Sequence, residues 1–179
     1  MKNIRAWWLA LLLVTLAALP STGAGINVSG NATGGTHEIC VITNSANIAI
    51  SNATDTAVTF DTETLDASGL HSTASNTSRI TFATAGWRDL YVQIVWAASA
   101  VGERRQVILK INGATFIGMY DMRPINATLE RPQAHSWGHY FAANDYVELF
   151  VHQDSGGNLN IKALDSAPNG LIFSSHGIF

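Results

Sequence analysis

Short apolar stretches of strand length, separated by turn residues, are the feature that most constrains the fold of this chain. They are rich in Val, Ile, Thr and aromatic residues, which favour strands, and only 13% of the 179 residues are charged. Such stretches recur at residues 39–42, 48–50, 58–60, 80–82, 90–96, 107–111, 115–120, 136–141, 146–151, 159–163 and 171–173. No helix is expected after residue 24. The pattern predicts an all-β sandwich or closed barrel.

The clearest strand follows a turn at residues 143–145. Val147, Leu149 and Val151 alternate with neighbours of the opposite parity, which is the period of a strand with one face on a core. Asn144 suits a left-handed turn position. Two further turns, Asn112-Gly113 and residues 154–158, predict that the strands flanking each turn are antiparallel neighbours.

The N-terminus carries a targeting signal. Lys2 and Arg5 precede an apolar run of 14 residues, and small residues follow up to Ala24. This pattern predicts a secretory signal peptide over residues 1–24. An uncleaved anchor is the competing interpretation, but the run is short against the roughly 20 residues that cross a bilayer. We therefore expect an exported, secreted or surface protein with no stable membrane span.

Residues 25–45 begin with a run rich in Gly, Asn and Thr, which predicts an N-terminal arm. Residues 46–179 are expected to form the folded domain. Cys40 is the only cysteine, so no disulfide can close within one chain; a buried thiol is the main expectation, and pairing between copies is the alternative.

The charge of the chain argues against a nucleic-acid partner. Without the signal peptide, eight basic residues stand against thirteen acidic ones, a net charge of about −5. Phosphate binding needs clustered Lys and Arg. The single basic pair, Arg104-Arg105, is interpreted as a solvated strand end.

Several motifs in residues 46–179 resemble a known family. Residues 141–149 are similar to the L-x-x-G-D-x-V-x-L turn of tumour necrosis factor-like jelly rolls, with Asn144 in place of Gly. That fold is shared with the globular heads of complement and collagen-family proteins. Residues 59–71, 78–82 and 85–87 resemble the complement-like domains of bacteriophage structural proteins. Arg88 departs from the pattern, since the family usually has Tyr there, and is expected to pair with Asp89 or Glu148.

The resemblance implies a two-sheet antiparallel jelly-roll sandwich that assembles as a compact trimer. Large aromatic residues on both parities of the strands near residues 89–96 and 134–141 also favour association, because they imply a sheet with two covered faces. Side chains of one parity are expected to face the core, and those of the other to face partner subunits. The predicted oligomer interface comprises Tyr91, Gln93, Ser136, Gly138 and Tyr140, with Ile39 and Val41 of the arm as an inter-subunit strand. Exposed tyrosines on a monomer are the alternative.

No set of residues predicts a reaction. His135 and His139 lie about 13 Å apart on a strand, too far for one zinc ion. No Ser carries a nucleophile-elbow pattern and no phosphate-binding glycine loop is present. No cofactor is expected; by analogy with the family, the resemblance leaves room for calcium on a trimer axis or at Asp61, Asp66 and Asp154.

These features favour an exported, non-enzymatic structural or adhesive subunit that forms a trimer or a fibre and displays surface loops. Virion decoration and an extracellular filament are the two settings considered. The alternative is a secreted carbohydrate-binding module that uses Trp87, Trp137 or Tyr146 as a sugar platform and recognises a glycan or surface receptor. N-glycosylation sequons begin at Asn27, Asn31, Asn52, Asn76 and Asn126. They predict surface glycans in a host that N-glycosylates exported proteins, and plain polar turn residues in one that does not.

Overall fold

The structure is a computed structural model that describes residues 38–124, 127–163 and 170–178. The chain divides into residues 1–34 and 35–179, and all described residues belong to the second unit. The predicted signal peptide and residues 25–37 of the predicted arm lie outside the described residues. So do the sequons at Asn27, Asn31 and Asn126.

The described residues form twelve strands and no helix. The strands are β1 (Ile39–Thr43), β2 (Ile48–Ile50), β3 (Thr56–Ala57), β4 (Thr62–Asp66), β5 (Arg79–Thr81), β6 (Gly86–Trp96), β7 (Arg105–Ile111), β8 (Thr115–Met122), β9 (Arg131–Phe141), β10 (Tyr146–Gln153), β11 (Leu159–Ile161) and β12 (Ile172–Ile178). Among these residues, no helix could cross a membrane.

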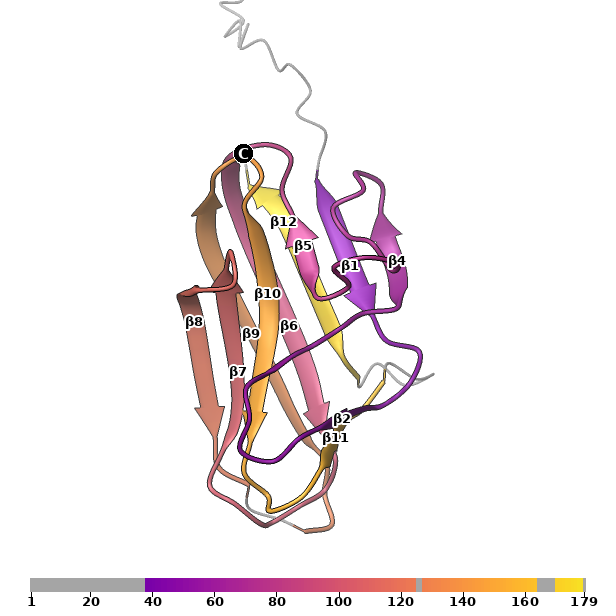
Figure 1. The fold of residues 1–179 in the computed structure, drawn as a ribbon, viewed down its shortest axis with the longest axis vertical. Helices are drawn as coiled ribbons and strands as arrows, with labels where there is room; N and C mark the ends of the chain where they lie inside the picture. Colours follow the sequence, from indigo (N-terminus) through magenta and orange to yellow (C-terminus); the bar gives the residue numbers. More distant parts are fainter. Residues whose placement is uncertain (1–37, 125–126, 164–169, 179) are drawn as a thin grey trace, which may run out of the picture. The chain divides into compact units, whose positions relative to one another are not determined.

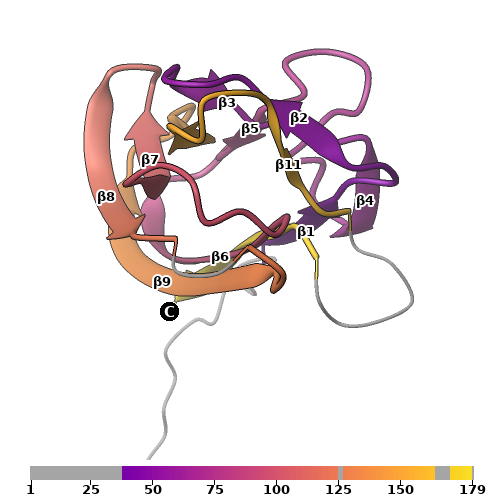
Figure 2. The same ribbon diagram turned by 90° about the horizontal axis from the view of Figure 1, so that it is seen from below.

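The strands form two antiparallel sheets that face each other (Figures 1 and 2). Sheet A has the order β2-β11-β6-β12-β1-β4, with β9 paired to the free side of β6. Sheet B has the order β3-β10-β7-β8, with β5 paired to β10. This architecture confirms the predicted all-β jelly-roll sandwich.

The core lies between the sheets and is built from alternate residues of facing strands. Val147, Leu149 and Val151 of β10 are fully buried, as the sequence pattern predicted. Leu90, Val92, Ile94 and Trp96 of β6 face them from sheet A and are also fully buried. Burial of these apolar side chains, at about 25 cal/mol per Å² removed from water, is the main force that holds the sheets together.

The hairpin predicted at Asn112-Gly113 is confirmed. Both residues have a positive φ, 51° and 74°, and the Ala114 amide donates to the Ile111 carbonyl at 3.1 Å. These values are those of a type I′ turn, whose twist matches that of the strands it joins, β7 and β8. Asn144 is likewise left-handed, with φ 69°.

The turn at residues 154–158 does not join neighbouring strands, so that prediction is wrong. It leaves β10 in sheet B and enters β11 in sheet A. The reason is that β10 has neighbours on both sides, β7 on one and β3 and β5 on the other. With no free edge beside β10, the chain crosses to the other sheet.

Two parts of sheet A differ from the sequence expectation. β4 was not predicted, because this exposed edge strand lacks apolar alternation. β1 was assigned to the arm, yet it pairs with β12 on one side and β4 on the other. β1 is therefore a strand of sheet A in its own chain. Residues 58–60 bury Val58 and Phe60 in the core without forming a regular strand.

Candidate functional surface

The outward face of sheet A gathers all the residues predicted to form the oligomer interface. Tyr91 on β6 lies opposite Ser136 on β9 and Ser174 on β12, and Ser174 in turn lies opposite Val41 on β1. We call the outward side chains of these four strands the sheet A face. It includes Ile39, Val41, Trp87, Asp89, Tyr91, Gln93, Ala134, Ser136, Gly138, Tyr140, Ile172, Ser174, His176 and Ile178.

One end of the sheet A face is strongly apolar. Trp87, Tyr140 and Ile178 are 55%, 52% and 51% exposed. Trp87 lies opposite Tyr140 on β9 and Ile178 on β12, and the rings of Trp87 and Tyr140 meet edge-on with centroids 6.0 Å apart. Contiguous exposed apolar side chains of this kind mark interaction surfaces.

The middle of the face is polar and carries one carboxylate, Asp89, which lies opposite Gly138 on β9 and His176 on β12. The Tyr91 hydroxyl donates to Gln93 Oε1 at 3.0 Å, and Gly138 has no atom within 4 Å of the position where a Cβ would lie. The open space above Gly138 makes this part of the face flat, which suits packing against another backbone or a broad side chain.

The outward face of sheet B exposes less aromatic surface, because cationic side chains of the same chain lie over two of its rings. Lys110 Nζ lies 3.9 Å from the centre of the Phe150 ring. Arg79 stacks on Tyr146 at 3.9 Å and its Nε lies 3.2 Å from Glu148 Oε1. Such pairs leave the rings of Phe150 and Tyr146 partly covered and the charges compensated. Phe116 and Met119, on the edge strand β8, remain more than half exposed.

The three residues predicted as a sugar platform are separated. Trp87 lies on the sheet A face, whereas Tyr146 lies on the other sheet beneath Arg79. Trp137 points into the sandwich and fits against Gly118 of β8, where an added Cβ would collide with its Nε1. The structure therefore does not bring the three rings into one site.

An aromatic cluster closes the side of the sandwich between β8 and β9, and we call it the β8–β9 flank. The ring centroid of His135 lies 3.7 Å from that of Tyr120 and 5.5 Å from that of Trp137. His135 Nε2 is buried with no hydrogen-bond partner, and desolvation by burial lowers the pKa of His135. Within the described residues β8 pairs with β7 alone and β9 with β6 alone. Sequence reasoning missed this cluster, because strand parity does not show which residues meet across the gap between sheets.

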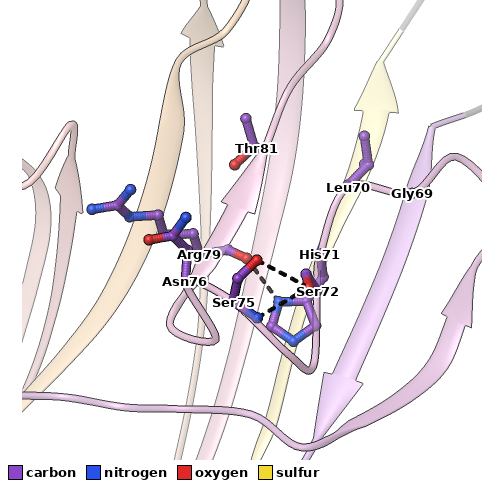
Figure 3. Close-up of a pocket in the computed structure, with 8 residues that line it drawn as sticks. All are labelled: Gly69, Leu70, His71, Ser72, Ser75, Asn76, Arg79 and Thr81. Atoms are coloured by element: carbon purple, nitrogen blue, oxygen red, sulfur yellow. Dashed lines mark hydrogen bonds between the residues drawn. The ribbon is translucent and has the colours of Figure 1, made fainter.

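A polar pocket of about 160 Å³ lies between the segment after β4 and β5 (Figure 3). Its polar groups hold the loop in shape. Ser72 Oγ accepts hydrogen bonds from the amides of Ala74 and Ser75 at 3.3 and 3.2 Å, and His71 Nδ1 lies 2.8 Å from the Arg79 carbonyl. The Arg79 side chain turns away from this loop, as Figure 3 shows, towards Glu148. The shape of this pocket is therefore explained by the hydrogen bonds within the loop that lines it.

The carboxylates considered for calcium cap turns instead. Asp61 accepts from the Ser45 amide and hydroxyl, Asp66 from the amides of Leu70 and His71, and Asp154 from the amides of residues 103 and 104. Hydrogen bonds from Ser45 and Thr62 lower the pKa of Asp61. No group of three or more His, Cys, Asp or Glu within the described ranges is arranged to hold a metal.

Two arginines lie where the sequence did not place them. Arg88 is 5% exposed and forms a salt bridge with Glu38, because its parity is that of inward-facing Leu90. The prediction that it pairs with Asp89 or Glu148 is wrong. Arg105 is 1% exposed and donates to the carbonyls of Val101 and Arg104, so it is not a solvated strand end.

Structural comparison defines the class of fold. No family model matches the sequence, and no curated protein matches it. Solved structures do match, and they show that the chain has the jelly-roll fold shared by tumour necrosis factor-like proteins and complement globular domains.

Three solved structures illustrate the likeness. Murine APRIL superposes with a TM-score of 0.58 at 13% identity, covering 79% of this chain and 99% of that one. The globular domain of zebrafish complement 1qA protein gives 0.56 at 14% identity, covering 80% and 98%. Eiger TNF from S. frugiperda gives 0.53 at 13% identity, covering 80% and 93%. At these identities the likeness shows the fold alone.

Proposed function

We propose that this protein is an exported, non-enzymatic structural or adhesive subunit that assembles with copies of itself through the sheet A face. The observation that carries the proposal is the contrast between the two outward faces. Trp87, Tyr140 and Ile178 are exposed together at one end of sheet A. On sheet B, Lys110 and Arg79 cap Phe150 and Tyr146, and the exposed Phe116 and Met119 lie on the edge strand β8. Exposed apolar area of that kind is stabilised by burial against a partner.

A trimer is the assembly that the family resemblance favours, and the structure offers two unlike surfaces to build it. The sheet A face and the β8–β9 flank meet along β9, which contributes outward residues to the face and the inward-facing His135 and Trp137 to the flank. A contact between unlike surfaces closes into a ring when the rotation between subunits allows it. In such a ring, each face would cover the Tyr120–His135–Trp137 cluster of the next subunit.

The predicted signal peptide and the exposed loops support a proposal for where the protein acts. We propose a secreted or surface-displayed product, as virion decoration or an extracellular filament, whose loops remain free for recognition. The described sequons begin at Asn52 and Asn76, which are exposed and lie in loops before β3 and β5. Neither loop belongs to the strands of the sheet A face, so glycans there are compatible with assembly.

Fibre formation by strand exchange remains the second mode of assembly. It would require β1 to leave its place between β12 and β4 and to pair with the same strands of another copy. Ile39 and Val41 would then contribute to an inter-subunit sheet. The ring needs no such opening, so we place it first.

Light scattering on a sizing column, with the signal-free chain at several concentrations, tests the proposal. We expect three times the protomer mass for the wild type and the protomer mass for Gly138→Arg, which adds a side chain where the single chain has free space. Gly157→Arg, also in free space but away from the face, is the matched control and should stay trimeric. A wild-type monomer, or a Gly138→Arg trimer, would refute assembly through this face.

A carbohydrate-binding module is the second candidate function. The observation that favours it is the exposed pair of Trp87 and Tyr140, since aromatic rings that stand free in solvent offer platforms for apolar sugar faces. Binding to a glycan array that is lost in Trp87→Ala, while light scattering shows a monomer throughout, would favour this function over self-assembly.

A further inference from the structure

The Asn112-Gly113 turn is tied to the neighbouring turn by its side chain. Asn112 Nδ2 donates to Asp145 Oδ1 at 2.8 Å, and the Tyr146 amide donates to Asn112 Oδ1 at 3.1 Å. Asp145 Oδ2 in turn accepts from the Ala142 amide at 2.7 Å. The Asn112 hydrogen bond and then the Ala142 amide lower the pKa of Asp145, so its carboxylate is an ionised acceptor at neutral pH. Both ends of the Asn112 amide are therefore held.

Asn followed by Gly is chemically labile when its side chain is free. The main-chain nitrogen of Gly113 can attack the side-chain carbonyl carbon of Asn112, and ammonia leaves with the proton of that nitrogen. The product is a five-membered succinimide, which water opens to aspartate or isoaspartate. A Gly at the second position leaves this approach unhindered, because it has no side chain.

We propose that Asn112 is a deamidation site that the folded turn protects, with Asp145 as the protecting residue. Attack requires the Asn112 side chain to rotate towards Gly113, which breaks its hydrogen bonds to Asp145 and Tyr146 together. The left-handed φ values of Asn112 and Gly113 and the Ala114–Ile111 bond fix the main chain at the same time. Conversion therefore starts when this turn opens locally.

The product would loosen the same end of the sandwich. Aspartate at position 112 would replace the donated hydrogen bond with two carboxylates facing each other, and isoaspartate would lengthen the main chain of a two-residue turn. The Asp145 turn is also bonded to Phe82, through Asn144 N to Phe82 O at 2.7 Å and Phe82 N to Asp145 O at 2.9 Å. That segment leads into β6 just before Trp87, so damage would reach the apolar end of the sheet A face.

The chain contains its own reference site, Asn169-Gly170. The test is peptide mass spectrometry of the full signal-free chain, incubated at mildly alkaline pH, with conversion measured at Asn112 and Asn169 in the same samples. We compare the native wild type, the wild type in urea and native Asp145→Ala. Urea should speed conversion at Asn112 strongly. Asp145→Ala should speed it by about tenfold, the factor expected for one charge-assisted hydrogen bond, with Asn169 unchanged.

Asp145→Asn keeps an amide oxygen as acceptor and should give a smaller increase. It also decides the question if Asp145→Ala fails to fold, because a folded Asp145→Asn protein with the wild-type rate would overturn the role of Asp145. Equal rates at Asn112 in the native and urea-unfolded wild type would overturn protection by the fold. This test is independent of assembly, since it is read from one peptide of the chain.

Discussion

At the scale of single residues, the buried pair of Arg88 and Glu38 shows how strand parity can place a charge in the core. Arg88 shares the inward parity of Leu90, and its guanidinium is compensated by Glu38 and by the Thr84 carbonyl at 3.1 Å. Arg88 also lies over the Phe82 ring, 5.2 Å from its centre. Pairing makes the position tolerable rather than strongly stabilising, since both ions have lost their hydration.

Removing one member of this pair should be costly. We expect Glu38→Leu to lower the free energy of unfolding by about 3–5 kcal/mol, because it leaves the Arg88 charge buried and uncompensated. Urea denaturation measures the change. The double variant Glu38→Leu with Arg88→Met should recover most of the loss; a double variant as unstable as the single one would contradict this account.

Gly118 is a residue whose position tolerates no larger side chain. A Cβ at this position would collide with the indole of Trp137, while one at Gly138 would meet nothing within 4 Å. We expect Gly118→Ala to destabilise the protein by about 1–3 kcal/mol, the usual range for overpacking. Gly138→Ala is the matched control. Thermal melts of the two variants should differ clearly, and equal melting temperatures would mean that Trp137 moves freely.

At the scale of elements, β1 is the strand whose place the sequence described least well. It carries Cys40, which is fully buried, and burial together with Asp66 and Glu63 raises the pKa of that thiol to about 12. The thiol is therefore both inaccessible and protonated near neutral pH, and protonated thiols are poor nucleophiles.

Labelling of Cys40 should report the release of β1. We expect no reaction with a maleimide or iodoacetamide probe in the native chain and rapid reaction in urea, followed by mass spectrometry. Rapid labelling of the native chain, with the far-UV circular dichroism unchanged, would show that β1 leaves the sheet easily. That result would favour strand exchange over the closed ring.

At the scale of the whole molecule, acid should weaken the fold through carboxylates that cap turns. Asp61 and Asp145 have pKa values lowered from 3.8, through hydrogen bonds from Ser45 and Thr62 and from Asn112 and the Ala142 amide respectively. A lowered pKa in the folded state means that the stability is present above the unfolded value and is lost as the pH falls through the folded value.

We therefore expect the melting temperature to be flat near neutral pH and to fall below about pH 4. Asp61→Asn should lower stability near neutral pH and reduce the slope in acid, because its group no longer titrates. Melts in a series of buffers measure both effects. An unchanged acid slope in Asp61→Asn and Asp145→Asn would show that other groups govern the acid transition.

Local sequence patterns predicted most of the strands, though not β3 or β4, together with the Asn112-Gly113 and Asn144 turns and the two faces of β6, β9 and β10. These features follow from local rules, since side-chain parity and left-handed turn residues act within a few positions. Apart from the β7–β8 hairpin, the pairing of strands depended on contacts in the folded structure. In the folded structure the turn after β10 crosses from sheet B to sheet A, and β1 lies within sheet A. Arg88 pairs with Glu38, and His135 lies between Tyr120 and Trp137. These contacts join residues that are distant along the chain, and they depend on which strand edges are free and which side chains meet across the gap between sheets.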